Sequence, residues 1–596
     1  MTSTHIHRLL AALLLATASR AAAVTVTRGP YLQTPTPSSM TLRWRTDTAT
    51  DSQVKYGAAP GSLGASAGDP ALTTEHVVTV TALAADTPYY YAVGSAGGAL
   101  IGDDADHWFR TAPTTGTATP FRIWTIGDAG FTGLNLDAVR DAFATFNGSS
   151  AADLFVLLGD NGYLVANDAQ YQAAVFDEHA AMLRTTPVYS VFGNHEAFSS
   201  SSLTQTGPYF DMFSFPMAAE AGGIASGTEA YFSFDYANVH FIVLDSEQAP
   251  TSSVTPMLTW LEADLQAATA DWVIALWHRP PYSKGLFHDS DVEANEVNMR
   301  QYALPILESY GVDLVLNGHS HNYERSGFLD GHYGLSTTIS AANRLDPGDG
   351  DPSGDGAYRK AALGPIPHSG AVFVVNGSGS EVRNTTLNHP AMVVNLLELG
   401  SVVVDVDGDT LTARMLNSAA VVRDTFRIVK GAPCAPAPVG GCDTAAKGRF
   451  TLRTNADPTK NTWAWTWQKG TLPPAGLGDP TAQTDLAVCV YDAGGLLVGG
   501  GVPAAAGEWK AKGSGFGYVD KLAARAGLRK LVTKVGTAPK GRIVTKAKGA
   551  AVGTPATPAA FPVTAQLVNR DSGTCWQSSF TSYSRNEAGK VTAVIK

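Results

Sequence analysis

Short runs of alternating apolar and polar residues occupy the first part of the chain, from about residue 24 to residue 113. Turn-forming residues separate these runs at nearly regular intervals, and a period of two is typical of strands that bury one face. The pattern predicts an N-terminal β-sandwich of about 90 residues, and the Thr- and Pro-rich stretch 111–120 predicts a linker after it. The clearest runs lie at 40–45, 53–56, 76–81 and 88–93.

From residue 121 onward, continuous apolar runs alternate with stretches of helical periodicity. Apolar strands are predicted at 121–126 and 154–158, with a helix at about 136–146 between them. A strand, a helix and a strand in succession indicate a βαβ unit, and hence an α/β domain. Further strands are predicted at 188–192, 240–244, 272–277, 314–317 and 372–375, and further helices at 169–182, 255–268 and 295–310.

The stretch 326–369 is long and loop-like, and its segment 348–356 is rich in Gly and Asp. A calcium loop is one interpretation of that segment, but a solvated loop is favoured because the complete ligand series of a calcium loop is missing.

After Lys430 the sequence becomes strand-like again, which predicts a C-terminal all-β domain over residues 431–596. Trp463, Trp465 and Trp467 fall on one face of a predicted strand in this domain. Such a row of indoles suits either a sugar-binding platform or the core of a sheet, and the core is the favoured interpretation.

Composition adds that the chain is folded and multidomain. Its 596 residues are too many for one hydrophobic core, and 44% hydrophobic with 16% charged residues is ordinary for globular proteins. The formal net charge of -11 argues against a nucleic acid as a stable partner. An anionic substrate stays open, because bound metal ions can invert the local field.

Residues 1–23 have the pattern of a cleaved export signal. Arg8 precedes an apolar run at 9–18, and Ala21, Ala22 and Ala23 match the small residues that signal peptidase reads. No later apolar run is long enough for a membrane-spanning helix. The sequence therefore predicts a secreted or periplasmic protein.

The cysteines support the same compartment. The chain has four, Cys434, Cys442, Cys489 and Cys575, and an even number suits two disulfides in an oxidising environment. The expected pairs are Cys434 with Cys442 and Cys489 with Cys575. A zinc site is the alternative, although none of the spacings is that of a typical zinc motif.

Five predicted strand ends carry side chains that can bind metal ions. Each is weak evidence alone, since a strand followed by Gly-Asp or by a lone His is common. Together, at one edge of an open sheet, they would offer carboxylates, imidazoles, an amide and a phenol. The segments are Gly127-Asp128-Ala129-Gly130, Gly159-Asp160-Asn161-Gly162-Tyr163, Gly193-Asn194-His195-Glu196, Trp277-His278-Arg279-Pro280 and Gly318-His319-Ser320-His321.

In this order, the five segments resemble the ligand series of the purple acid phosphatases, within the dinuclear calcineurin-like metallophosphoesterases. The resemblance covers about residues 24–430, because Gly29-Pro30-Tyr31-Leu32-Gln33 and the strand of Trp44 are similar to the family's first domain. It implies a fibronectin-III-like β-sandwich at 24–113. It also implies a metallophosphoesterase domain at 119–430, a β-sandwich flanked by helices, and leaves 431–596 as a β domain of unknown role.

The resemblance also implies how two metal ions are held. One set of expected ligands is Asp128, Asp160, Tyr163 and His321, and the other is Asp160, Asn194, His278 and His319. Asp160 would bridge the ions, since a carboxylate has two oxygens. In the family the tyrosine-bound metal is Fe(III), as phenolate hardness explains, and the second is Zn, Mn or Fe. A metal-bound hydroxide would attack the phosphorus of a phosphate monoester in line.

Two more histidines are candidates for contact with the substrate. His195 lies one residue beyond an expected ligand, and we expect it to protonate the leaving group or to contact phosphate. The alternative is that it orients a ligand. The resemblance implies a substrate contact for His288, which lies in the loop after His278.

The predicted function is that of a secreted, binuclear acid phosphatase acting on small phosphate esters. A phosphodiesterase or nucleotidase with the same site stays open, because the ligands do not distinguish these substrates. A non-enzymatic surface-binding protein is a further alternative, although the intact ligand set argues against it. The sequence does not indicate an oligomeric state.

Overall fold

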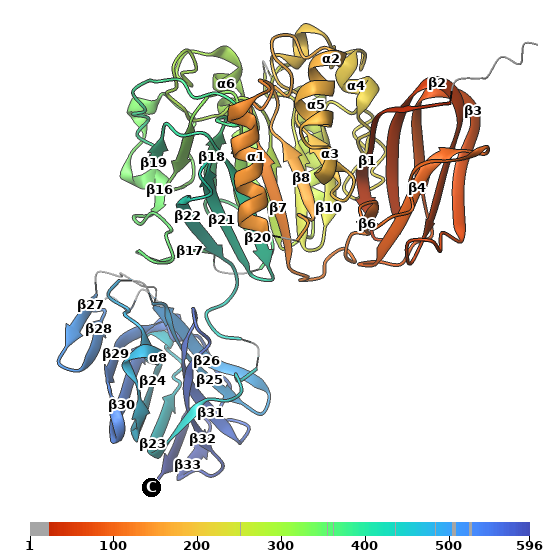
Figure 1. The fold of residues 1–596 in the computed structure, drawn as a ribbon. Coiled ribbons are helices and arrows are strands. Elements are labelled where there is room, and N and C mark those ends of the chain that lie inside the picture. The colour runs from red at the N-terminus through yellow and green to blue at the C-terminus, as the bar shows by residue number, and fades with distance from the viewer. Residues whose placement is uncertain are drawn as a thin grey trace, which may run out of the picture.

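The computed structural model describes residues 23–596, except 149, 249, 251, 355, 361–362, 436, 483, 503–507, 522 and 524–526. The predicted export signal lies outside the described residues, apart from Ala23. An N-terminal β region, a central α/β region and a C-terminal β region follow one another along the chain (Figure 1). Within the described part of the chain, no helix is long and apolar enough to cross a membrane.

The N-terminal region is a six-stranded antiparallel sheet in which the long β2 pairs with β1, β3 and β4. Leu42, Trp44 and Tyr91 form part of its core, and this inward-facing set reflects the alternation seen in the sequence. Tyr31 joins the region to the next one, since its hydroxyl donates to the carbonyl of Met212 at 2.7 Å. The strands are β1 (Val26–Thr36), β2 (Ser39–Gly57), β3 (Ala65–Val80), β4 (Pro88–Ser95), β5 (Gly98–Gly102) and β6 (Trp108–Arg110).

Two seven-stranded sheets form the central region. Their facing side chains make one core, to which Ile126 and Leu157 contribute from one sheet and Leu276 and Leu316 from the other. The first sheet has the order β17 (Tyr358–Arg359), β22 (Val422–Val429), β21 (Thr410–Asn417), β20 (Gly400–Asp407), β7 (Phe121–Ile126), β8 (Leu154–Leu157), β9 (Val188–Ser190). The second has the order β10 (Phe232–Tyr236), β11 (Val239–Val243), β12 (Trp272–Leu276), β13 (Leu314–Asn317), β18 (Val372–Asn376), β14 (Tyr323–Ser326), β19 (Met392–Leu396).

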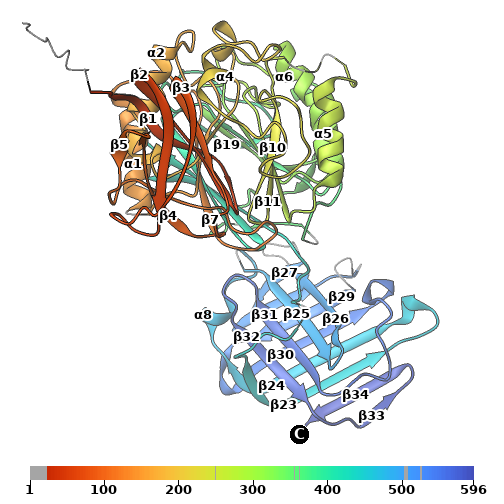
Figure 2. The same cartoon turned by 90° about the vertical axis from the view of Figure 1, so that its right-hand side faces the viewer.

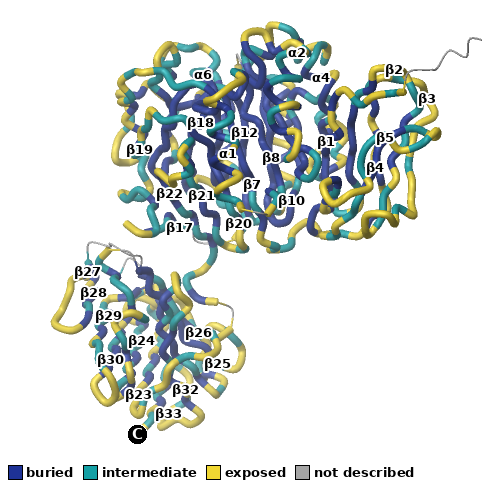
Figure 3. Tube along the Cα trace, in the orientation of Figure 1, coloured by how far each residue is buried: buried dark blue, intermediate teal, exposed yellow. Residues whose placement is uncertain are grey.

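The strands whose ends carry the candidate metal ligands pair in parallel with their neighbours. β7, β8 and β9 run parallel in one sheet, and β11, β12, β13 and β18 run parallel in the other. Apart from Arg122 in β7, these strands are buried along their whole length (Figure 3), which explains why they read as nearly continuous apolar runs in the sequence. Every predicted strand of the central region is present, with ends within one or two residues of the prediction.

Two predicted helices, α1 (Leu134–Asn147) and α5 (Pro256–Ala267), are present and continuous. The helices predicted at 169–182 and 295–310 are each interrupted by a π-helical turn. In the second case the interruption directly precedes Pro305, which has no N–H to continue the α-helical ladder. The pieces are α2 (Asp168–Tyr171), a π turn (Gln172–Asp177) and α3 (Ala180–Leu183), then α6 (Ala294–Asn298), a π turn (Met299–Ala303) and α7 (Leu304–Ser309).

The described residues of the loop predicted at 326–369 form short elements only. β15 (Phe328–Leu329) pairs with β16 (Arg344–Asp346), and 3-10 turns lie at Ser336–Thr338 and Ala341–Asn343. In the Gly- and Asp-rich segment, the carboxylates of Asp349 and Asp351 accept hydrogen bonds from backbone N–H groups two residues further on. Such local turns favour the solvated-loop interpretation.

Apart from the short helix α8 (Pro474–Leu477) and two 3-10 turns, the elements described in the C-terminal region are the twelve strands of one sheet. In Figure 2 this region lies below the central region, to which the chain joins it. Trp463, Trp465 and Trp467 are buried in its core, so the core interpretation of these indoles is confirmed and the sugar-binding platform is wrong. The strands are β23 (Asp443–Arg453), β24 (Thr462–Leu472), β25 (Leu486–Asp492), β26 (Gly495–Val502), β27 (Trp509–Lys512), β28 (Gly515–Val519), β29 (Leu528–Lys534), β30 (Gly536–Lys548), β31 (Val563–Asn569), β32 (Cys575–Phe580), β33 (Arg585–Glu587) and β34 (Lys590–Ile595).

The predicted disulfide pairs are wrong. The structure joins Cys434 to Cys489 and Cys442 to Cys575. The entering chain crosses the sheet, so that Cys434 lies against β25 while Cys442 lies beside the start of β32, where Asp443 pairs with Trp576. All four cysteines are therefore in disulfides, and the zinc alternative is wrong as well.

Candidate metal centre

The five predicted strand-end segments meet between the two central sheets. They follow β7, β8, β9, β12 and β13, whose carboxyl ends lie at the same edge of the region because the strands are parallel within each sheet. Asp128, Asp160 and His319 each follow such a strand with positive φ, of 56°, 54° and 68°. This backbone conformation is rare outside glycine and is characteristic of functional sites.

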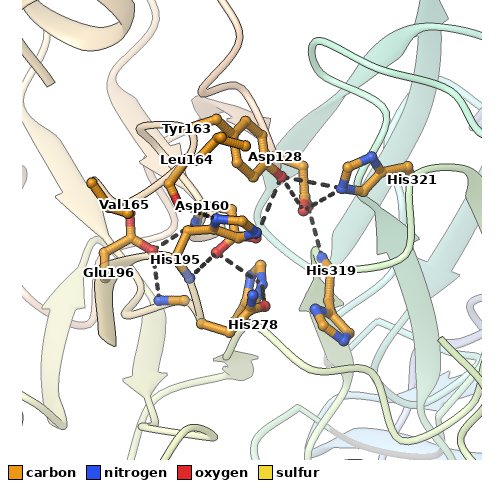
Figure 4. Close-up of polar contacts among 12 residues, drawn as sticks. Asp128, Asp160, Tyr163, Leu164, Val165, His195, Glu196, His278, His319 and His321 are labelled. Carbon is orange, nitrogen blue, oxygen red and sulfur yellow. Dashed lines mark hydrogen bonds and ion pairs between the residues drawn. The ribbon is translucent and has the colours of Figure 1, made fainter. Parts of the chain in front are cut away.

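Four of the predicted ligands form a first group around the hydroxyl of Tyr163. The hydroxyl lies 3.0 Å from Asp128 Oδ1, 3.3 Å from Asp160 Oδ2 and 3.1 Å from His321 Nε2. His321 Nε2 is in turn 3.3 Å from Asp128 Oδ1. Four potential metal-ligand atoms from three different loops therefore converge on one point (Figure 4).

The remaining predicted ligands form a second group beside the first. His278 Nε2 lies 3.1 Å from Asn194 Oδ1 and 3.4 Å from Asp160 Oδ1. Ligand atoms of Asp160, His278 and His319 lie within 4.8 Å of one another. The two groups share Asp160, whose Oδ2 faces Tyr163 and whose Oδ1 faces His278.

Hydrogen bonds on the far side of the rings orient the imidazoles. His278 Nδ1 donates to the carbonyl of Leu158 at 2.8 Å, and His321 Nδ1 donates to Glu381 Oε2 at 2.8 Å. Both rings therefore turn the lone pair of Nε2 toward the centre, as metal-binding histidines do. His319 Nε2 lies 3.1 Å from Glu293 Oε2 and 3.1 Å from Arg279 Nη1.

The electrostatics of the site favour cations. Burial raises the pKa of Tyr163 well above its ordinary value, and the charges of Asp128 and Asp160 raise it further. Burial alone would raise the pKa of Asp160, but His278 and His195 hold it below its ordinary range. Among the described residues, no Lys or Arg forms an ion pair with either carboxylate. Two buried carboxylates without such a partner, surrounded by phenol, amide and imidazole side chains, fit a pair of metal ions.

Glu196 supports the loops of the candidate centre, although the sequence had suggested no role for it. Its buried carboxylate accepts from the backbone N–H groups of Asp160, Asn161 and Gly193, at 2.8, 2.9 and 2.9 Å. Burial and the charge of Asp160 raise the pKa of Glu196 to about 7. The residue ties the loops after β8 and β9 together, and its place beside Asn194 and His195 in the sequence was the available signal.

Glu381 and Glu293 were missed for a different reason, and Arg279 stood in a quoted segment without an assigned role. Glu381 lies far along the chain from its partner His321, so no local motif points to it. Arg279 binds Glu247 with two of its nitrogens, at 2.8 and 3.0 Å, and its Nη1 lies 3.1 Å from His319 Nε2. These three residues orient the histidines of the centre.

The two histidines predicted to meet the substrate flank the centre. The ring of His195 is partly exposed, its Nδ1 donates to the carbonyl of Leu164 at 2.6 Å, and its Nε2 lies 3.7 Å from Asp160 Oδ2. His288 lies on the other side, with its ring 3.9 Å from that of His319 and its Nδ1 3.0 Å from Glu293 Oε1. In each ring Nδ1 is therefore held by a partner, and Nε2 is the nitrogen left for other contacts.

Comparison with known proteins identifies two families of domain. Residues 29–111 match the purple acid phosphatase N-terminal domain, and residues 121–323 match the calcineurin-like phosphoesterase family. Among curated proteins, purple acid phosphatase 15 of Arabidopsis thaliana is 29% identical over 279 residues, which are 42% of this chain and 49% of that protein. Purple acid phosphatase 1 of Ipomoea batatas is 28% identical over 265 residues, 42% of this chain and 51% of that protein.

The solved structures agree at the level of the fold. A purple acid phosphatase isolated from yellow lupin (Lupinus luteus) seeds superposes with a TM-score of 0.52 at 18% sequence identity, covering 68% of this chain and 75% of that one. The chain spans about half the length of the curated relatives it matches.

Proposed function

The chain is a relative of the purple acid phosphatases within the calcineurin-like phosphoesterases, and from this premise we propose that it hydrolyses phosphate monoesters with two metal ions. The observation that supports the proposal most is the position of Asp160 between the two groups of ligands. Its two oxygens face different donors, Tyr163 on one side and His278 on the other, as a bridging carboxylate requires.

In this proposal one ion is held by Asp128, Asp160, Tyr163 and His321, and the other by Asp160, Asn194, His278 and His319. Phenolate hardness favours Fe(III) in the first position and Zn, Mn or Fe in the second. Such ions act as Lewis acids and lower the pKa of water, which supplies a nucleophile near neutral pH.

The protein's own groups would bind the ester and handle its proton. His195 protonates the oxygen of the leaving group, because its Nδ1 is fixed by the carbonyl of Leu164 and its Nε2 lies 3.7 Å from the bridging carboxylate of Asp160. His288, fixed by Glu293, contacts a phosphoryl oxygen from the other side. The proposed substrate is a small phosphate ester. Hydrolysis rates of an aryl monoester and an aryl diester, measured under the same conditions, show which of the two esters the protein prefers.

The main test is metal analysis of the purified chain, combined with its visible absorption spectrum and hydrolysis of an aryl phosphate. We expect about two ions per chain, an absorption band from charge transfer between Tyr163 and Fe(III), and loss of that band in Tyr163→Phe. A chain that binds no metal, and that does not hydrolyse the ester when iron plus zinc or manganese is supplied, contradicts the proposal.

We also propose that the protein is secreted or periplasmic and that its N-terminal sheet is of the fibronectin III type. The two disulfides support an oxidising compartment. The match of residues 29–111 to the purple acid phosphatase N-terminal domain supports the second point. The domain limits we propose remain 24–113, 119–430 and 431–596.

A further inference from the structure

A separate group of metal-binding side chains lies at the opposite edge of the second central sheet. Glu308 is near the end of α7, Asp330 directly follows β15, and His368 shortly precedes β18. Ligand atoms of the three lie within 4.8 Å of one another. β13 runs from this edge to the candidate metal centre, and its four residues span roughly 13 Å. The group is therefore distinct from the centre that contains Asp160.

The carboxylate of Glu308 is only half satisfied by its surroundings. Glu308 is 3% exposed, and its Oε2 accepts from the N–H of Gly331 at 2.9 Å and from the hydroxyl of Tyr333 at 2.5 Å. Among the described residues, no hydrogen-bond donor reaches its buried Oε1. A buried carboxylate oxygen without a partner is costly, and burial accordingly raises the pKa of Glu308 to about 7.

The three segments that carry the group are already held together by their backbones. The N–H of His368 donates to the carbonyl of Glu308 at 2.8 Å. Leu329 and Ala371 exchange two backbone hydrogen bonds, of 3.0 and 2.9 Å, which holds the segment of Asp330 beside that of His368. His368 Nδ1 lies 3.2 Å from Asp330 Oδ1. A ligand entering here meets donors that are preorganised.

The charge of the group points to a cation. Two carboxylates face one imidazole, and no Lys or Arg among the residues that the structure describes forms an ion pair with Glu308 or Asp330. One nitrogen and two oxygen donors suit zinc, whereas calcium prefers oxygen alone. The ring of His368 is half-exposed, so solvent can supply the fourth ligand of a tetrahedral ion.

We propose that Glu308, Asp330 and His368 bind a third divalent metal ion, preferably zinc, which fastens α7 and the turn after β15 to the entry of β18. This ion takes no part in hydrolysis, because it lies at the opposite end of the strands from the candidate metal centre. Its role is to neutralise the buried carboxylate of Glu308 and to stabilise the three segments against unfolding.

The test measures zinc per chain and melting temperature on the full-length protein equilibrated with zinc and then desalted. His368→Ala and Asp330→Asn should each carry one zinc fewer than the unaltered chain, and should lose the rise in melting temperature that zinc produces. Glu262→Gln, an exposed residue of α5 outside the group, is the matched control and should behave as the unaltered chain does. Hydrolysis of an aryl phosphate should stay within about twofold in all of them.

Equal zinc content and an equal zinc-dependent melting temperature in the unaltered chain and His368→Ala would overturn the proposal. Because His368 is half-exposed, that variant is expected to fold, and its activity or circular dichroism verifies this. Anomalous diffraction at the zinc edge is a second measurement, and an absent peak between Glu308 and His368 also overturns it. A failure of the proposed phosphatase activity would leave both readouts intact.

Discussion

At the scale of single residues, Glu196 explains why the loops after β8 and β9 hold their shape. Its carboxylate accepts from three backbone N–H groups, those of Asp160, Asn161 and Gly193. The hydroxyl of Tyr171 donates to the same carboxylate at 2.9 Å. The strained backbone at Asp160 therefore has a specific support.

We expect Glu196→Gln to weaken metal binding or phosphatase activity about 10- to 100-fold. The amide would point N–H groups at backbone donors that now meet a carboxylate, so the loops after β8 and β9 would move apart. Metal content and kcat/KM measure the effect. Glu229→Gln is the control, since Glu229 also accepts from a backbone N–H, that of Phe215, away from the centre. An equal loss in both variants would contradict the role of Glu196.

The proposed role of His195 as proton donor predicts that the effect of losing it depends on the leaving group. In His195→Ala, kcat for phenyl phosphate should fall by about 100-fold or more. The fall should be smaller for 4-nitrophenyl phosphate, because its leaving group departs without a proton. His288→Ala is the comparison, and its loss should be similar for both esters if His288 contacts only the phosphoryl oxygens. Equal losses for the two esters in His195→Ala would refute proton donation by this residue.

The sequence predicted the metal ligands of the candidate centre better than it predicted the residues that orient these ligands. Asp128, Asp160 and His319 could be found because each follows an apolar strand in a short, readable segment. Glu381 could not be found in this way, since it meets His321 only after the chain has folded. A residue such as Glu381, which orients a ligand from a remote part of the chain, carries no local pattern, and the tertiary contact is its only signal.

At the scale of elements, the buried His240 joins β10, β11 and α5. Its Nδ1 lies 2.7 Å from Asp235 Oδ1, and its Nε2 lies 2.8 Å from Asp264 Oδ2. Burial alone would lower the pKa of His240, but the two carboxylates raise it to about 9. The folded state therefore holds the proton more tightly than the unfolded state, whose His titrates near 6.5.

This raised pKa predicts that the stabilisation from His240 is complete below about pH 6.5 and is lost as the pH rises through about 9. The linkage is worth on the order of 3 kcal/mol. Melting temperatures of His240→Gln and the unaltered chain should therefore differ most near pH 6 and converge above pH 9. His179→Gln is the control: burial lowers the pKa of His179 to about 4, so its effect should be constant between pH 7.5 and 9.5. A constant difference for His240→Gln would contradict the linkage.

Whether a segment is a helix or a strand was predictable where the segment is buried along its whole length. It was less predictable where the backbone conformation or the strand pairing depends on other parts of the chain. β12 is recognisable from the run Trp272–Leu276 alone, because it is covered on both faces. The π turn at Met299–Ala303 was not predicted, although Pro305 gave a reason to expect an irregular helix there. The pairing of β7 with β20, which is remote in the chain, left no trace in either segment.

At the scale of the whole molecule, the candidate centre and the disulfides belong to different parts of the chain. All predicted ligands lie between Asp128 and His321, whereas both disulfides lie beyond Lys430. The composition predicted several domains, but the order in which the cysteines pair depends on how the chain enters the C-terminal sheet. The short distance in sequence between Cys434 and Cys442 therefore did not predict a disulfide between them.

This separation predicts that the disulfides stabilise the C-terminal region without supporting catalysis. Sequence separations of 55 and 133 residues correspond to about 4 and about 5 kcal/mol in the loop-entropy model. The double variant Cys442→Ser with Cys575→Ser should lower the melting temperature of a C-terminal transition while kcat and metal content stay within about twofold. Thr564→Ala with Ser579→Ala, an uncrosslinked pair across β31 and β32, is the matched control and should leave both transitions in place. A loss of metal or activity in the cysteine variant would mean that the C-terminal region supports the centre after all, through contacts such as the one between Arg359 and Asp485.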